Sequence, residues 1–202
     1  MTRDTNTEAI DSLWEQSVIA AQAGNTVQVL AILQSLAEKG VWQALARIGE
    51  LYEIGGGNLE KDPDKAIQWY RRSIFECDDP VAHLGLGRFY YNGTSVDRDF
   101  GKSYMHFQKA SLSHLPEANL YIGIMMYSGT GTKKDIEKAT KYFTMAAASD
   151  FCIAFLYLAR IHFRTGHLIK AIACLFKARA VATRLGQVDP NDRRLMGMTS
   201  LI

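Results

Sequence analysis

Apolar residues recur along the chain at the spacing of amphipathic helices, and glycine-rich or polar stretches separate one periodic segment from the next. The segment ALARIGELYEIGGG, which starts at Ala44, shows the pattern, because its helical run ends in three glycines. Asp62 and Pro63 then stand where a second helix would begin, since aspartate caps helix starts and proline fits the first helical turn. The pattern predicts an all-α chain of antiparallel helix pairs joined by glycine-rich loops.

This pattern returns at a nearly constant interval, which is typical of a solenoid. AHLGLGRFYYNGTS begins at Ala82, ANLYIGIMMYSGTG begins at Ala118, and a more divergent copy, AFLYLARIHFRTGH, begins at Ala154. The starts lie 38, 36 and 36 residues apart. We predict about five helix pairs in a single domain over residues 1–186, with the boundaries 8–39, 41–78, 79–114, 115–150 and 151–185. Residues 187–202 are expected to form a tail or to cap the last pair.

Three kinds of residue keep their place from copy to copy. Glycine inside a helix costs about 1 kcal/mol relative to alanine, so a recurring glycine predicts that another backbone packs too close for a side chain. These glycines are Gly49, Gly87 and Gly123. A second glycine set is expected to end helices in the left-handed conformation, and an aspartate set to cap the helices that follow. The two sets are Gly55, Gly93 and Gly129, and Asp62, Asp99 and Asp135.

Together these landmarks resemble the Sel-one-like repeat, a short relative of the tetratricopeptide repeat. A unit of that family carries an alanine, a leucine-glycine pair, a tyrosine, a glycine loop, an aspartate, a lysine-alanine pair and paired aromatics. The resemblance covers residues 41–182 and is specific for the units from Ala44, Ala82 and Ala118 taken together. The fourth unit lacks the long loop and its aspartate. The resemblance implies a right-handed α-solenoid that acts as an adaptor or scaffold for protein complexes.

Composition narrows the classes of function. The net charge is +2, from 23 basic and 21 acidic residues, which argues against general nucleic-acid binding. No apolar run is long enough to cross a membrane, and the polar first residues do not fit a secretory signal, so we expect a cytoplasmic protein with no membrane partner. The three cysteines are odd in number and lack CxxC spacing, which predicts buried, inert thiols.

Stacked repeats present a concave surface lined by the first helix of each pair. Positions six and three residues before each landmark glycine, and one and four after it, share one face of that helix. We predict that this face binds a partner protein in a groove with an apolar centre, an acidic start and a basic end. The predicted partner-binding residues are Glu50, Glu53, Val81, Leu84, Arg88, Tyr91, Leu120, Ile124, Tyr127, Leu156, Arg160, Phe163 and Arg164. An alternative interpretation is that they pack against neighbouring first helices.

Charge is distributed unevenly along the chain. Residues 1–78 carry a net charge of −5, residues 79–150 carry +1 and residues 151–202 carry +6. Ends of opposite sign would favour one direction of a bound peptide, and they make weak association between copies a second hypothesis. The sequence does not identify the partner. An immunity or chaperone-like protein that sequesters an effector is a further hypothesis within this class.

Residues with catalytic chemistry do not form a recognised motif. None of the five histidines has a second metal ligand four residues after it on one helix, and GTGTKK at 129–134 lacks the spacing of a phosphate-binding loop. We therefore expect no enzyme activity, no metal and no cofactor. The competing hypothesis is an enzyme or a regulatory subunit with a small-molecule site around Tyr127, Arg160 and His162.

Overall fold

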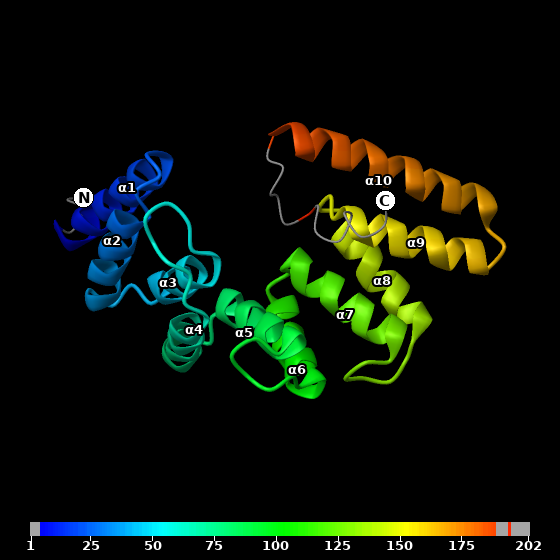
Figure 1. Cartoon of the computed structure of the whole chain (residues 1–202), viewed down its shortest axis with the longest axis horizontal. Coiled ribbons are helices and arrows are strands. Elements are labelled where there is room, and N and C mark those ends of the chain that lie inside the picture. Colours follow the sequence, from blue (N-terminus) through cyan, green and yellow to red (C-terminus); the bar gives the residue numbers. More distant parts are fainter. Residues whose placement is uncertain (1–4, 189–193, 195–202) are drawn as a thin grey trace. The chain divides into compact units, whose positions relative to one another are not determined.

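The helices of the chain form two compact units, residues 1–99 and residues 100–202. The computed structural model describes residues 5–188 and residue 194. Within this part the first unit contains α1 (Thr5–Gln22), α2 (Thr26–Glu38), α3 (Gln43–Ile54), α4 (Pro63–Cys77) and α5 (Pro80–Asn92) (Figure 1). The second contains α6 (Phe100–Leu112), α7 (Pro116–Ser128), α8 (Ile136–Ala147), α9 (Cys152–Arg164) and α10 (Leu168–Val188). The predicted all-α fold of helix pairs is confirmed.

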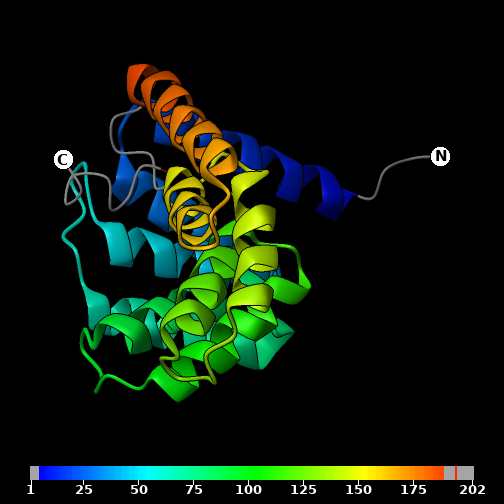
Figure 2. The same ribbon diagram turned by 90° about the vertical axis from the view of Figure 1, so that its right-hand side faces the viewer.

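Consecutive helices pack against each other within each unit. In the first unit α5 contacts both α3 and α4, so the first helix of a pair lies on both helices of the pair before it. In the second unit α9 and α10 lie side by side as an antiparallel pair in both views (Figures 1 and 2). Among the described residues there is no strand, and one isolated bridge joins Gly56 to Leu59.

Helix starts follow the predicted capping pattern. The carboxylates of Asp62 and Asp135 accept hydrogen bonds from the backbone N–H groups of Lys65 and Lys138 at 3.0 and 2.9 Å, which caps α4 and α8. Asp99 directly precedes α6. Proline occupies the first turn of α4, α5 and α7, where the missing N–H has no helical partner.

Helix ends confirm the left-handed prediction at two of the three glycines. Gly93 and Gly129 adopt the left-handed conformation after α5 and α7. Gly55 has a positive φ of 68° but a ψ of −158°, so the prediction of a left-handed cap is wrong there. The chain leaves α3 in an extended direction that only glycine adopts readily, because it must enter the turn closed by Gly56 and Leu59.

The recurring helical glycines make room for an aromatic ring. A Cβ at Gly49 would lie 2.6 Å from Cε1 of Tyr70, and a Cβ at Gly123 would lie 2.8 Å from Cδ1 of Phe143. Gly85 in α5 approaches Tyr70 from its other edge. The sequence prediction of a neighbouring backbone is therefore wrong for Gly49 and Gly123. A ring from the second helix of the same pair fills the space that a side chain would need.

The domain prediction and the tail prediction stay predictions. The boundary between the two compact units follows Asp99, inside the predicted repeat 79–114, whereas we expected one domain over residues 1–186. In the predicted tail, 187–202, the structure describes the last two residues of α10 and Arg194, and the other residues lie outside the described part. No described helix is both long enough and apolar enough to span a bilayer.

Candidate functional site

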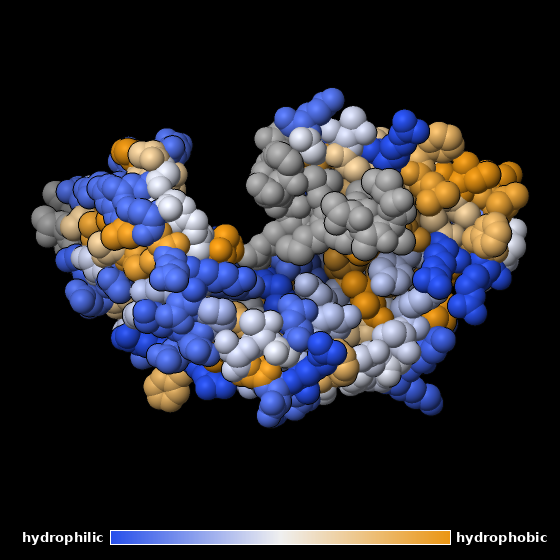
Figure 3. Space-filling view, in the orientation of Figure 1, coloured by the Kyte–Doolittle hydropathy of each residue, from blue (hydrophilic) through white to orange (hydrophobic). Residues whose placement is uncertain are grey.

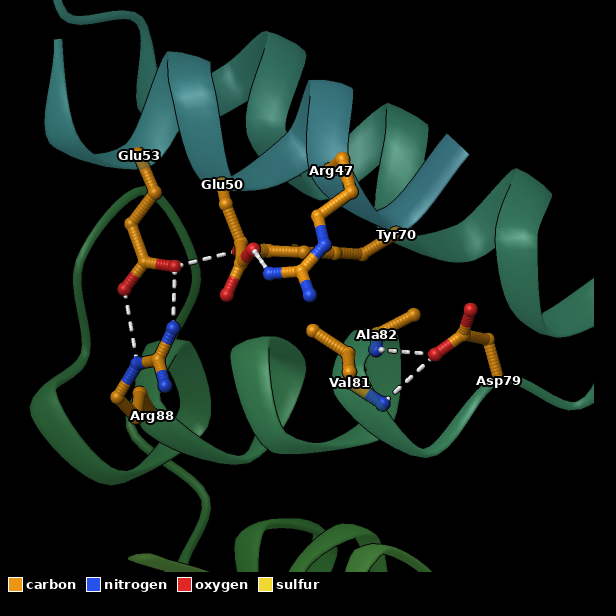
Figure 4. Close-up of polar contacts among 8 residues, drawn as sticks. All are labelled: Arg47, Glu50, Glu53, Tyr70, Asp79, Val81, Ala82 and Arg88. Atoms are coloured by element: carbon orange, nitrogen blue, oxygen red, sulfur yellow. Dashed lines mark hydrogen bonds and ion pairs between the residues drawn. The ribbon is translucent and has the colours of Figure 1, made fainter. Parts of the chain in front are cut away.

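In the first unit, the predicted groove residues Glu53 and Arg88 bind each other. Arg88 of α5 donates from Nε to Oε1 of Glu53 at 2.8 Å and from Nη2 to Oε2 at 2.5 Å (Figure 4). The hydroxyl of Tyr70 donates to the same Oε2 at 2.6 Å. The side chains of Arg88 and Glu53 are 6% and 17% exposed. This two-point ion pair is the strong, geometrically specific kind, and it ties α3 to α5.

Burial gives the Tyr70 hydroxyl a fixed role in this network. Removal from water, and after it the nearby Glu53 carboxylate, raise the pKa of Tyr70 well above its usual range. The hydroxyl therefore stays protonated and acts as a hydrogen-bond donor to Glu53. Glu50, the other acidic residue predicted at the start of the groove, accepts a hydrogen bond from Arg47 at 2.7 Å.

Most of the remaining predicted residues of the first unit are also covered. Leu84 is buried, and Val81 and Tyr91 are partly buried. Val81 packs on the hydrophobic cluster around Tyr70. These side chains of the first unit contribute to internal packing and charge pairing, and partner binding by them stays a prediction.

In the second unit the predicted residues divide between buried and exposed positions. Leu120 is buried, and Ile124, Tyr127 and Leu156 are partly buried. The guanidinium of Arg160 lies over the ring of Tyr127, 5.9 Å from its centre, which is a cation–π contact. Arg160, Arg164 and Phe163 are exposed. These three are the predicted partner-binding residues of the second unit that face solvent, and their role in binding stays a prediction.

A small basic hollow lies where α9 ends. It has a volume of about 270 Å³ and is lined by Tyr127, Lys134, Ile136, Ile161, Arg164 and Thr165. Lys134 and Arg164 form no ion pair with another described residue, and the buried hydroxyl of Tyr127 has no hydrogen-bond partner there. Burial, and the charges of Lys170 and His167, lower the pKa of the neighbouring His162. The ring of His162 contacts that of His167.

Among the described residues, a group of exposed apolar side chains lies on α9 and α10. It is orange in Figure 3, and we call it the α9–α10 apolar surface. Its members are large hydrophobic residues with about half or more of their area exposed, namely Phe163, Leu168, Ile169, Ile172, Leu175 and Phe176. A hollow of about 490 Å³ lies along it, lined by Leu156, Ala159, Arg160, Phe163, Leu168, Ala171, Ile172 and Leu175.

The hollow brings together three predicted residues with others that the sequence analysis missed. Leu156, Arg160 and Phe163 of α9 were predicted, whereas the α10 residues were not, because only first helices were expected to line a binding surface. A signal for α10 was present in the sequence. Leu168, Ile172 and Leu175 follow the spacing of one helix face, and residues 151–188 include six basic residues and no acidic one.

Residues that could carry other chemistry stay apart in the described part of the chain. No group of three or more His, Cys, Asp or Glu residues comes together there in a way that could hold a metal ion. Of the three cysteines Cys152 is buried, Cys174 is partly buried and Cys77 is exposed, so the prediction of buried thiols is wrong for Cys77. Cys77 ends α4, where one side faces water, and its thiol donates to the carbonyl of Ser73 at 3.3 Å.

Known proteins share both the sequence pattern and the fold. A stretch of 86 residues is 37% identical to the ERAD-associated E3 ubiquitin-protein ligase component HRD3B of Arabidopsis thaliana and covers 42% of this chain and 13% of that protein. A Sel1 repeat protein from Oxalobacter formigenes aligns over 95% of this chain and 86% of its own, with a TM-score of 0.70 and 20% identity. The protective antigen c5321 of uropathogenic Escherichia coli aligns over 79% of this chain and 36% of its own, with a TM-score of 0.66 and 27% identity.

The family assignment follows from the repeats themselves. The chain spans less than a fifth of the length of the curated relatives that it matches. The family model described as Sel1 repeat matches residues 42–74, 80–113 and 116–151, about half of the chain, and these ranges coincide with the three pairs that carry the sequence landmarks. The all-α solenoid of repeats agrees with the Sel1 repeat structures. The chain belongs to the Sel1 repeat family.

Proposed function

We propose that this chain is a non-enzymatic protein-interaction module that binds a partner polypeptide on the α9–α10 apolar surface. Sel1 repeat proteins generally act as protein-interaction modules. HRD3B is by name a component of an E3 ubiquitin-protein ligase. The observation that carries the proposal is the exposure of neighbouring large hydrophobic side chains beside a hollow of about 490 Å³. Contiguous apolar patches on a protein surface mark interaction sites, whereas scattered single residues do not.

The exposed side chains of this surface are large enough for their burial to contribute substantial binding free energy. Phe163 and Phe176 are each 68% exposed, and Leu175 is 50% exposed. Full burial of one such side chain is worth about 1.5–3 kcal/mol. Covering these three alone therefore supplies several kcal/mol toward the cost of association.

Arginines give the surface a positive charge as well. Arg160 lines the hollow, Arg164 lies one helical turn further along α9, and Arg179 lies one turn beyond Leu175 on α10. None of these three forms an ion pair with a described residue, whereas Arg184 on the same helix pairs with Asp150. Because guanidinium groups bind carboxylates well, the partner segment should carry acidic residues next to apolar ones.

The test is selection from a displayed library of random peptides against the immobilised full chain. Peptides that bind are then measured against wild type, Leu175→Asp and a control, Phe75→Asp, by fluorescence anisotropy. Phe75 is an exposed aromatic residue on α4, in the other unit, so the control makes a similar change away from the proposed surface. Circular dichroism checks that both variants stay folded.

We expect selected peptides to bind Leu175→Asp at least about tenfold more weakly than wild type, a difference of about 1.4 kcal/mol. The Phe75→Asp variant should bind like wild type. The proposal is wrong if selection yields no specific peptide. It is equally wrong if the selected peptides bind Leu175→Asp as tightly as wild type.

A further inference from the structure

Each second helix in the repeats places a large side chain under the first helix of the next pair. This side chain stands five residues after the repeat lysine and is fully buried at Tyr70, Phe107 and Phe143. Tyr121 of α7 stacks on Phe107 with ring centres 4.5 Å apart, and Tyr157 of α9 stacks on Phe143 at 4.7 Å. In the first unit Gly85 of α5 lies against Tyr70. Gly85, Tyr121 and Tyr157 occupy the same repeat position, three residues after the alanine that opens each unit.

In the last pair the equivalent residue is uncovered. Leu175 stands five residues after Lys170 and is 50% exposed. Phe163 occupies the repeat position of Glu53 and Tyr127. In the earlier repeats an arginine of a later first helix contacts this position, Arg88 at Glu53 and Arg160 at Tyr127. Phe163 itself is 68% exposed. Among the described residues, no helix fills the place on α9 and α10 that α5 fills on α3 and α4.

The shape of this place fits an α-helix. Its floor is the hollow between α9 and α10, and Leu168, Ile172 and Leu175 form a stripe along one wall. Two packed helices offer a groove into which the ridge of a third helix fits. A helix that presents residues three and four positions apart can cover both walls, as α5 does on α3 and α4.

The positive charge around the groove favours acidic residues on the flanks of that helix. Arg160 lines the hollow, Arg164 and Arg179 stand four residues after the lining residues Arg160 and Leu175, and residues 151–188 contain no acidic side chain to balance them. A helix with acidic residues flanking its apolar stripe would bring carboxylates to these arginines as the apolar face is buried. A basic helix would instead add repulsion.

A second copy of this chain is a poorer occupant than a helix of another protein. The acidic helix of the chain is α1, but its apolar residues Ile10, Leu13 and Trp14 already pack on the core of the first unit. Its exposed positions include Asp11 and Glu15. Docking α1 in the groove would place these carboxylates on an apolar floor, which is costly without a partner for each.

We propose that the groove between α9 and α10 binds an amphipathic α-helix of another protein, in the place that the first helix of a following repeat would take, with acidic residues of that helix next to Arg160, Arg164 and Arg179. This proposal rests on the proposed function and adds the conformation and the charge of the bound segment. It also assigns the bound helix a register, because one of its side chains must cover Leu175.

The experiment uses a set of matched synthetic peptides and the full chain. The parent peptide is an acidic amphipathic helix of about five turns with leucine, alanine and one tyrosine on its apolar face and glutamate on the other. One control has lysine in place of glutamate, and another has proline at its centre, which breaks the helix. Binding to wild type, Leu175→Asp and Phe75→Asp is measured by fluorescence anisotropy, and light scattering gives the mass of the chain alone.

We expect the parent peptide to bind wild type and Phe75→Asp equally, and Leu175→Asp at least about tenfold more weakly. The lysine and proline peptides should each bind wild type at least about tenfold more weakly than the parent peptide does, and added salt should weaken binding of the parent peptide. The helix proposal is overturned if the parent peptide does not bind, or if the proline peptide binds equally well. Library peptides that still depend on Leu175 would then leave the proposed function standing.

Two other outcomes would identify a different occupant and overturn the proposal. Light scattering that shows the chain associating with itself, with the association lost in Leu175→Asp, would identify a second copy. Parent-peptide binding that appears only after Leu195 and Met196 are changed to aspartate would identify the chain's own last residues. A loss of binding that is equal in Leu175→Asp and Phe75→Asp would show that the peptide does not use the groove.

Discussion

Replacing Gly49 by alanine should destabilise the first unit, although alanine is the better helix former. The new Cβ would lie 2.6 Å from Cε1 and 2.7 Å from Cδ1 of Tyr70. Carbon atoms reach optimal contact at about 3.5 Å, so the ring would have to move by about 1 Å. It has little freedom to do so, because Gly85 lies against its opposite edge and its hydroxyl is held 2.6 Å from Glu53.

The expected magnitude follows from two opposing terms. Extra methylene volume in a well-packed core costs about 1–3 kcal/mol, and removing a glycine from a helix returns about 1 kcal/mol. The upper half of the first range applies because the fully buried Tyr70 is held on both sides. We therefore expect the free energy of unfolding of the first unit to fall by about 1–2 kcal/mol.

Urea unfolding followed by circular dichroism measures this change. Gly186→Ala in α10 is the matched control, because nothing lies within 4 Å of its new Cβ, and it should stabilise the helix by about 0.5–1 kcal/mol. In a Tyr70→Leu background the Gly49→Ala change should lose its cost. The packing argument is refuted if Gly49→Ala is as stable as wild type, or if its cost persists without the tyrosine ring.

Three other predictions test the charged and capping groups. Arg88→Met should cost about 3 kcal/mol because it removes the positive charge next to the largely buried Glu53 carboxylate, whereas Arg88→Met/Glu53→Gln should recover part of the loss. Denaturant unfolding measures both, and equal losses would contradict the pairing. The pKa of His162 should lie below 6.5 when measured by NMR, and Lys170→Gln should raise it. Because the folded state favours the neutral ring, the stability that this group contributes is present above pH 6.5 and is lost as the pH falls through the folded pKa. Asp135→Ala should lower the midpoint of thermal unfolding through loss of the α8 cap, and an unchanged midpoint would show that the cap contributes nothing.

Helix positions were predictable because their causes lie close together in the sequence. Apolar spacing, proline in the first turn and aspartate before it act over a few residues, so α4 and α8 begin where Asp62 and Asp135 predict. The recurrence of the unit also allowed the pairing of the helices to be predicted. The glycine landmarks were located correctly, but the ring of Tyr70 against Gly49 required coordinates, because the two residues belong to different helices.

The candidate site was only partly predictable from the sequence. Glu53 and Arg88 were assigned to opposite ends of a charged groove, yet they bind each other, because α5 packs on α3 and brings residues 35 positions apart into contact. Leu156, Arg160 and Phe163 were predicted and do line a hollow. Their α10 neighbours were missed, because only first helices were expected to line a binding surface.

The sequence by itself determined that this chain forms helix pairs of one repeating kind, because periodicity and caps are local properties. Only the tertiary structure decided which equivalent side chains are covered. Leu84 and Leu120 are buried by their neighbours, and Tyr70 and Phe143 lie under a following helix, whereas Leu175 at the same repeat position as the two rings is half exposed. Burial depends on which helix packs next, and that is a property of the arrangement in space.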